Sequence, residues 1–425
     1  MPSFGARGFL AALLVCVFAR ETAAQVQLTP DAAPFKVEFG ANYFVQISSR
    51  QNLPYNDEAF TDEETFLWER LRPKLTVSNS RVSFVLEGQD THAKGSEFGV
   101  RRAWFDLLNA FVEVRQMRGW SLKIGRRQAD FDTIPRLIRV PDFAAVVRSF
   151  DVAEASWQHR STDLRAFAFR TVENDPDRFN TWKAGERLWT VFAAQTLGQQ
   201  KLQTYVTTKH NTSVRSESGT LGSGAIYAWQ VQSYGHVARW NVTYSLEHIL
   251  ERGHTSNDDV RASGLFGSLM QTYAKHHDVE VRYVRTSGDE RADDGKRGTF
   301  DPFYPANGPI GGLGLMRFSN LHALSIGATH TLTNRATLAW RLHESHLTTL
   351  NDAWYLGSSV TGTIVRRNAT SSRIGSETDV IFIYRFSPKL TTRVGYFGLR
   401  PGAYLKNTGG YGSPYEFRVQ IYGDL

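Results

Sequence analysis

Apolar and polar residues alternate along most of this chain, in short segments separated by turn-forming residues. In residues 67–77, Leu71 and Leu75 fall on one parity, whereas Arg70 and Arg72 fall on the other. Successive side chains of a β-strand point to opposite faces. The segment is therefore predicted to be a strand with one apolar face and one charged face.

The same rhythm recurs about eighteen times, with short turns alternating with longer connections. The predicted strands are residues 35–49, 67–77, 82–89, 98–108, 120–128, 149–159, 163–172, 188–196, 202–209, 225–233, 238–250, 260–273, 279–286, 321–331, 336–346, 378–386, 390–399 and 416–425. The longest loops are expected at 287–314 and 348–370. An even strand number places both termini of the chain on the periplasmic side, where the short turns are expected.

This pattern predicts an all-β fold, a transmembrane antiparallel β-barrel with short periplasmic turns and long extracellular loops. The mean hydropathy is −0.35 and the aromatic content is 12%, which suits strands that face lipid on one side only. The last strand also alternates, with Phe417, Val419 and Ile421 against Arg418 and Gln420. A soluble sandwich or propeller is the alternative. It would show polar outer faces, or repeats of fixed period, and the chain shows neither.

The N-terminus has the layout of a secretory signal. Arg7 precedes a short apolar run at residues 9–18, and Thr22, Ala23 and Ala24 supply small residues before Gln25. We therefore predict a signal peptide at 1–24 and a barrel over 25–425. An uncleaved anchor is the alternative, but the apolar run is too short to span a bilayer. The single cysteine, Cys16, lies in this segment, so disulfides are not expected.

The formal net charge is +7, and arginines dispersed through the strands supply most of the positive charge. Nucleic acid, an anionic membrane surface and an anionic solute would each suit such a chain. Export makes nucleic acid an improbable partner. Outer-membrane lipid and lipopolysaccharide on the outside, and an anionic solute on the inside, are the expected partners.

Alternation assigns many of the basic residues to polar, lumen-facing positions, where rings of positive charge select anions. These residues are Arg70, Arg72, Lys74, Arg127, Arg239, Arg282, Arg341 and Arg418. Carboxylates expected in the same lumen are Asp106, Asp151, Glu247, Glu280 and Asp379. Two interpretations remain open for each arginine. It lines an anion path, or it is neutralised by one of these acids.

The adjacent Arg126 and Arg127 cannot both face the lumen of a regular strand. Trp120, Leu122 and Ile124 define the lipid face of residues 120–128, and Arg126 continues that face. We therefore expect Arg127 in the lumen and Arg126 at the headgroup level, near lipopolysaccharide phosphates.

Signals of enzymatic chemistry are weak. The chain has no Gly-x-Ser-x-Gly elbow and no phosphate-binding loop. The adjacent His276 and His277 would point apart in a strand, and the acidic run around Asp293 and Asp294 is expected to be a solvated loop rather than a calcium site. We predict no catalytic site, metal or cofactor. A barrel enzyme or a surface adhesin is kept as a third hypothesis.

Five short motifs, in this order, resemble those of the alginate export family. They are residues 70–73 (RLRP), 124–128 (IGRRQ), 148–151 (RSFD), 300–305 (FDPFYP) and 374–379 (IGSETD), and the resemblance extends over nearly the whole predicted mature chain. It implies a monomeric outer-membrane barrel of 18 strands that passes an acidic polysaccharide through an arginine-rich constriction. It further suggests a periplasmic export complex as a candidate partner.

On matching positions, the resemblance gives the constriction role to Arg72, Arg127 and Arg148, with Asp151 as a balancing carboxylate. The short turn at 387–389 departs from family members that carry a longer periplasmic plug there. We therefore predict a bacterial outer-membrane channel for passive, anion-selective passage of an acidic polysaccharide or oligosaccharide. A general or small-anion porin without a polymer role is the main alternative.

Overall fold

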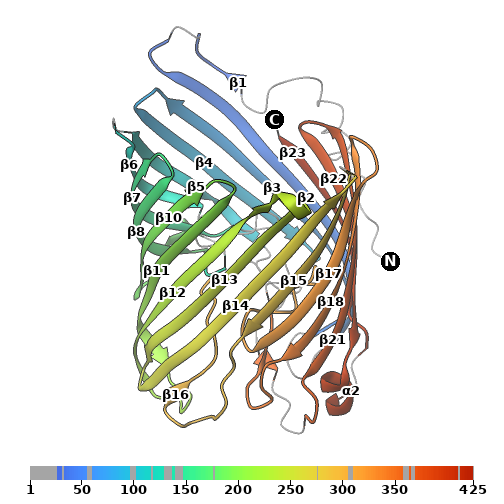
Figure 1. Cartoon of the computed structure of the whole chain (residues 1–425). Coiled ribbons are helices and arrows are strands. Elements are labelled where there is room, and N and C mark those ends of the chain that lie inside the picture. Colours follow the sequence, from blue (N-terminus) through green and yellow to red (C-terminus); the bar gives the residue numbers. More distant parts are fainter. Residues whose placement is uncertain are drawn as a thin grey trace.

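An antiparallel barrel of 18 strands makes up the computed structural model of this chain (Figure 1). The structure describes residues 26–30, 33–54, 60–95, 102–115, 118–128, 136–138, 147–175, 178–274, 276–304, 310–357, 363–364, 369–409 and 412–424. The predicted signal peptide lies outside the described residues.

Each predicted strand corresponds to one strand of the barrel. They are β2 (Lys36–Pro54), β3 (Phe60–Ser78), β4 (Val82–Lys94), β5 (Arg102–Arg115), β6 (Trp120–Gln128), β7 (Ser149–His159), β8 (Thr162–Glu173), β10 (Glu186–Leu197), β11 (Gln200–Arg215), β12 (Leu221–Val237), β13 (Val242–Thr255), β14 (Asp258–Tyr273), β15 (His277–Thr286), β17 (Leu321–Thr331), β18 (Ala336–Leu347), β21 (Arg373–Ser387), β22 (Leu390–Pro401) and β23 (Tyr415–Asp424). The barrel closes where β2 pairs antiparallel with β23, from Asn42 opposite Asp424 to Gln51 opposite Tyr415.

The remaining elements are short. β1 (Val26–Gln27) pairs with β2, β9 (Thr181–Trp182) with β8, and β16 (Lys296–Arg297) runs parallel to β14. A separate ribbon joins β19 (Trp354–Tyr355) to β20 (Thr363–Ile364). Within the described ranges, the helical elements are η1 (Ala238–Trp240) and α2 (Ala403–Gly409). Among the described residues, no helix is long and apolar enough to cross a membrane.

The two ends of the barrel differ. Tight turns, such as those between β3 and β4 and between β7 and β8, gather at one end together with the last residues of β23 (Figure 1). The strands β6, β15 and β18, which long stretches of sequence separate from the next barrel strand, end at the opposite end. We call these the short-turn end and the loop end. Short turns are periplasmic in outer-membrane barrels, so the loop end is extracellular.

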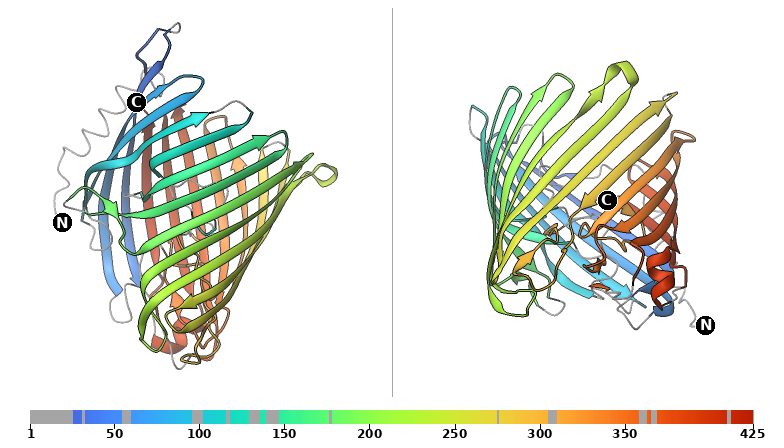
Figure 2. Two further views of the ribbon diagram at one scale, coloured as in Figure 1. Left: turned by 90° about the vertical axis from the view of Figure 1, so that its left-hand side faces the viewer. Right: turned by 60° about the horizontal axis from the view of Figure 1, so that its bottom comes forward.

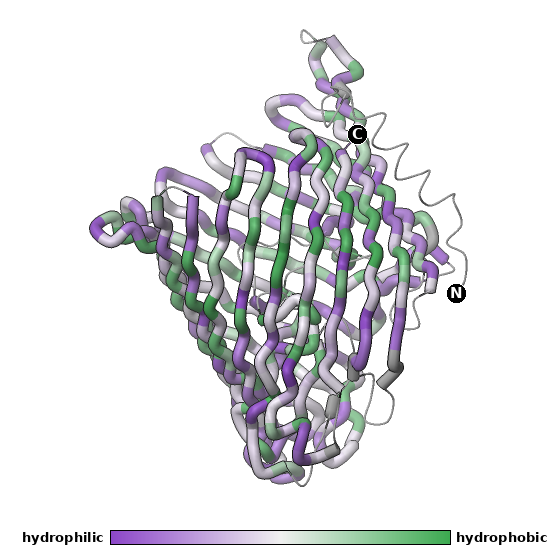
Figure 3. The backbone as a smooth tube through the Cα atoms, turned by 90° about the vertical axis from the view of Figure 1, so that its right-hand side faces the viewer, coloured by the Kyte–Doolittle hydropathy of each residue, from purple (hydrophilic) through white to green (hydrophobic). Residues whose placement is uncertain are grey.

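The two faces of the wall differ as the alternation predicted. On β10, Trp189 and Val191 are 54% and 66% exposed and point outward, whereas Thr190 and Phe192 are buried inside. The inward face elsewhere carries buried polar groups, among them Glu251 on β13. Figure 3 shows hydrophilic and hydrophobic positions following one another along each strand. Apolar side chains on the outside are stable only where lipid covers them.

The lumen is partly filled by loops from the loop end (Figure 2). The main one belongs to the connection between β15 and β17, and we call its described residues, 287–304 and 310–320, the inner loop. Its Phe300, Tyr304 and Phe318 are buried and pack against inward rings of the wall, with Phe266 and Phe318 centroids 5.2 Å apart. The barrel therefore has an apolar core inside its lumen, which alternation along the strands does not predict.

Candidate functional site

Arg70, Arg72 and Lys74 lie in one inward row of β3. The Arg70 side chain is 1% exposed, donates from Nη2 to Asn42 Oδ1 at 3.4 Å, and sits 4.8 Å above the Phe44 ring. Arg72 donates from Nε and Nη2 to Gln89 Oε1, at 3.2 Å each. Lys74 lies opposite Gly40 on one side and Glu87 on the other. These inward positions are the ones that alternation assigned.

The neighbours Arg126 and Arg127 separate as alternation predicted. Arg127 is the register partner of Phe150, whose ring packs in the lumen against Tyr304. Its Nη1 pairs with Glu154, which is also inward. Arg126 is the partner of Asp151 and shares the outward face with Ile124, which is 56% exposed.

Asp151 does not lie in the lumen, and this prediction was wrong. Phe150 takes the inward position at this height, so the next residue must point outward. There Asp151 Oδ1 accepts from Arg126 Nε at 2.9 Å. Arg148, the other member of this motif, lies just before β7 with its guanidinium 4.5 Å from the Tyr304 ring. Asp151 therefore does not balance the charge of Arg148.

The prediction that Arg239 faces the lumen was also wrong. The sequence predicts a turn at 234–236, but β12 continues to Val237, and Arg239 lies in η1 at the short-turn end. The turn closes at Asn241, which adopts a left-handed φ of 49° that asparagine tolerates better than most residues. The Arg239 side chain is exposed at this turn and does not line the wall.

Arg282 and Arg341 occupy inward positions on β15 and β18, but their surroundings differ. Arg282 Nε lies 2.5 Å from Glu280 Oε1. Arg341 is the register partner of Asp379, yet no carboxylate lies within ion-pair distance of Arg341 in the part of the chain that the structure describes. Asp379 instead accepts from His343 Nε2 at 3.3 Å and from the Gly312 amide at 3.0 Å.

Arg393 on β22 is an inward residue that our sequence analysis missed. It lies near the Tyr422 hydroxyl and near Arg341 and Arg418. It makes no ion pair with a described carboxylate, whereas Arg418 is paired with Glu416 at 2.6 Å. The signal was present in the sequence, because Val394 and Tyr396 define an outward parity that turns Arg393 inward.

Arg70, Arg341, Arg393 and Arg418 together form what we call the arginine arc. It lines the inner wall across β18, β22, β23 and β3, which lie close together around the barrel, separated only by β21 and β2. The Tyr422 hydroxyl lies among Arg70, Arg393 and Arg418. The arc thus combines fixed positive charge with a neutral hydroxyl, a set of donors suited to carboxylates and sugar hydroxyls.

The inner loop is anchored at its first part by Asp301. This carboxylate accepts from Lys209 Nζ at 3.0 Å and from Arg317 Nη2 at 3.2 Å, while its own amide donates to Glu251 Oε2 at 2.9 Å. Burial tends to raise the pKa of Asp301, but the nearby cations outweigh burial and hold that pKa well below its ordinary value. Asp301 is therefore ionised at neutral pH.

The second part of the inner loop is held by the opposite wall. The amides of Gly312 and Leu313 donate to Asp379 at 3.0 Å and to Glu377 at 2.8 Å, and Arg418 donates to the Gly312 carbonyl at 2.9 Å. A Cβ on Gly312 would lie 2.0 Å from Phe397 Cδ1, so only glycine allows this approach. The loop therefore crosses the lumen from β11 and β13 to β21 and β23.

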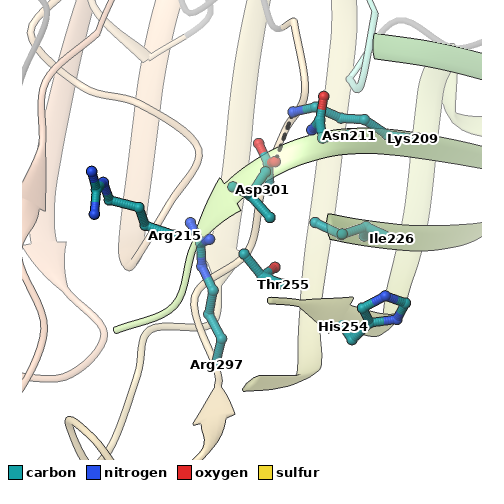
Figure 4. A pocket seen from close by; sticks show the side chains of 10 residues that line it. Lys209, Asn211, Arg215, Ile226, His254, Thr255, Arg297 and Asp301 are labelled. Atoms are coloured by element: carbon teal, nitrogen blue, oxygen red, sulfur yellow. Dashed lines mark hydrogen bonds and ion pairs between the residues drawn. The ribbon is translucent and has the colours of Figure 1, made fainter. Parts of the chain in front are cut away.

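A cavity of about 280 Å³ opens beside the Asp301 anchor, at the loop end (Figure 4). Lys209, Arg215, Arg297 and Asn211 line it, together with Asp301. Lys209 is committed to Asp301, and Arg297 forms no hydrogen bond or ion pair with any described residue. Arg297 therefore adds positive charge to this cavity, where it acts on Asp301 without a direct ion pair.

Acidic residues also gather at the loop end. Burial and the nearby Asp289 raise the pKa of Glu217 to about 7, although the Asp293 amide donates to Glu217 Oε2 at 3.2 Å and opposes the rise. Within the described ranges, no group of three or more His, Cys, Asp or Glu residues could hold a metal ion.

The profile of the alginate export family matches residues 37–418. The chain belongs to the alginate export family. The match runs from β2 into β23 and includes both anchors of the inner loop. No curated protein sequence matches the chain significantly.

Solved structures with a similar fold are outer-membrane proteins. The outer membrane protein OpdK from Pseudomonas aeruginosa superposes with a TM-score of 0.63 at 11% identity, covering 92% of this chain and 98% of that one. A BenF-like porin from Pseudomonas fluorescens Pf-5 superposes with a TM-score of 0.63 at 10% identity, with the same coverage of both chains. At such identities the likeness shows the fold. With the family, it makes this alginate export family member a porin-like channel of the bacterial outer membrane.

Proposed function

We propose that this alginate export family member is a passive, anion-selective path for an acidic polysaccharide or oligosaccharide. The observation that carries this proposal is that Arg341 and Arg393, on the inner wall, form no ion pair with a described carboxylate. Other inward arginines are neutralised, such as Arg127 by Glu154 and Arg282 by Glu280. A guanidinium that no described carboxylate pairs with directly keeps its hydrogen-bond donors available to a solute.

The chemistry of the arginine arc fits carboxylate-bearing sugars. A guanidinium can donate two parallel hydrogen bonds to one carboxylate, and its charge lowers the electrostatic barrier for an anion in a narrow lumen. Amide and hydroxyl groups nearby, such as Gln420 and Tyr422, can exchange hydrogen bonds with sugar hydroxyls. Many weak sites in sequence permit release as well as entry.

Nothing in the sequence supplies an energy source, so we propose that flow follows the solute gradient. The proposal includes a monomeric barrel that lacks residues 1–24 and works with a periplasmic export complex. Light scattering of the purified protein tests the monomer, N-terminal sequencing tests a start at Gln25, and crosslinking in cells tests the complex.

The decisive experiment measures ion selectivity in planar bilayers. Under a salt gradient, the wild-type reversal potential should show anion preference, and uronate oligomers should block the current. Replacing Arg341 and Arg393 with Gln should move the reversal potential toward cation preference and weaken block. The matched control replaces Arg187 and Arg261, which are exposed on the outside, and should change neither. Cation preference in the wild type, or no difference between the two double variants, would contradict the proposal.

A small-anion porin is the second candidate, because the inner loop crosses the lumen and narrows it. A narrow lumen would admit small carboxylates but not a polymer chain. Block by small dicarboxylates together with indifference to uronate oligomers would favour this candidate.

A further inference from the structure

Four adjacent strands present a row of cationic and imidazole side chains at the loop end of the outer face. Arg285 on β15 lies opposite His322 on β17, His322 opposite His346 on β18, and His346 opposite Arg373 on β21. Each residue is the register partner of the next, so the row crosses the strands without interruption. We call it the outer basic row.

The row faces outward, at the edge of the apolar band. His322 shares its parity with Leu324 and Ile326, which are 52% and 44% exposed on the lipid side. Arg285 likewise shares its parity with Val281, which is 39% exposed. Beyond the row, β15 and β17 end within a residue or two, and the chain passes into the inner loop. The row therefore lies where the hydrocarbon layer gives way to headgroups.

One end of the row is neutralised and the other is not. Glu344 Oε1 accepts from Arg373 Nε at 2.6 Å and lies 3.3 Å from His346 Nε2. Arg285 is exposed, and it forms no hydrogen bond or ion pair within the described part of the chain. His322 forms no hydrogen bond or ion pair with a described residue, and its ring lies 5.4 Å from that of Tyr283 and 6.1 Å from that of His346 between centroids. Arg285 and His322 are thus open to a ligand.

We propose that Arg285 and His322 bind a phosphate group of lipid A in the outer leaflet. The loop end is extracellular, and the lipid of that leaflet carries phosphates on its sugar headgroup at this depth. A guanidinium forks onto phosphate oxygens, and an imidazole N–H donates to them in either protonation state. Tyr283 lies two residues before Arg285 on the same face of β15, closer to the middle of the membrane, and its amphipathic ring suits the interface.

This site is independent of transport, because neither residue faces the lumen. The test uses the full-length barrel in detergent and native mass spectrometry with defined lipids: bisphosphorylated lipid A, its dephosphorylated form and phosphatidylglycerol. The Arg285→Gln/His322→Gln variant should bind bisphosphorylated lipid A about tenfold more weakly, which is the effect of losing a charged hydrogen bond. The matched control, His277→Gln/Arg335→Gln, changes the same residue types at the short-turn end and should bind like wild type.

Equal binding by both double variants, or equal binding of dephosphorylated lipid A to wild type, would overturn the site. Phosphatidylglycerol binding as tightly as lipid A would assign the row to phospholipid instead. Inorganic phosphate that displaced lipid A at micromolar concentration would show a site for the free anion, and the lipid assignment would fail. Unchanged single-channel conductance of the Arg285→Gln/His322→Gln variant shows that the barrel is folded, so lost binding cannot be attributed to unfolding.

Discussion

Charged side chains line the inner wall on both sides, but they are paired on β10, β11 and β13, and two arginines on β18 and β22 lack ion pairs with described carboxylates. On one side, wall residues bind the inner loop. Glu186 of β10 accepts from the Tyr304 hydroxyl, Lys209 of β11 donates to the Asp301 carboxylate, and Glu251 of β13 accepts from the Asp301 amide. On β18 and β22, Arg341 and Arg393 form no ion pair with a carboxylate of the described residues. A charged wall is therefore not by itself a charged path, because a loop from elsewhere can neutralise it.

The largest expected loss of stability follows from removing the Asp301 carboxylate, which pairs with Lys209 and Arg317. Replacing Asp301 with Ala leaves Lys209 and Arg317 facing each other without their shared carboxylate, and Lys209 is only 12% exposed. Breaking a buried pair from one side costs about 3 kcal/mol. We expect urea unfolding to show this loss, and single-channel currents to become larger and noisier as the inner loop is released.

Asp259→Asn is the control for that variant, since its pair with Arg261 is well exposed and contributes little. Quiet currents of wild-type size in the Asp301→Ala variant would show that this anchor does not hold the inner loop.

A smaller loss of stability should follow from a change at Gly312, where the inner loop is held against β21 and β23. A methyl group on Gly312 would collide with the Phe397 ring, and overpacking of this kind costs about 1–3 kcal/mol. Gly312→Ala should therefore lower the unfolding midpoint and shift the inner loop away from β21 and β23. Gly267→Ala, where the nearest atom is Ser245 O at 4.0 Å, should leave the midpoint unchanged. Equal midpoints for the two variants would contradict the close approach.

The smallest effect concerns pH at the loop end. The pKa of Glu217 rises to about 7 from its ordinary 4.5, so the folded loops prefer the protonated form. Their stabilisation is full below about pH 4.5 and is lost as pH rises through about 7. Hydrogen exchange of residues 287–295 should therefore be slower at pH 5.5 than at pH 8, after correction for intrinsic rates. Glu217→Gln should flatten this difference, and an undiminished difference would exclude Glu217 as its source.

The sequence by itself determined the barrel and the facing of its regular strands. Alternation has a period of two residues and is therefore local, so it placed Arg70, Arg72 and Lys74 inward without knowledge of any neighbour. The same rule separated Arg126 from Arg127. Where the local pattern was interrupted, at Asp151 after a loop and at Arg239 in a turn, the parity was lost and the prediction was wrong.

Only the tertiary structure decided which charges are neutralised. Lys209 and Asp301 lie 92 positions apart in sequence, and Gly312 and Asp379 lie 67 apart. Such pairs depend on how a loop folds back into the lumen, which no period in the sequence encodes. The strand pattern sets where a charged side chain points, and the partners that neighbouring strands and the inner loop bring to it decide whether its charge is paired.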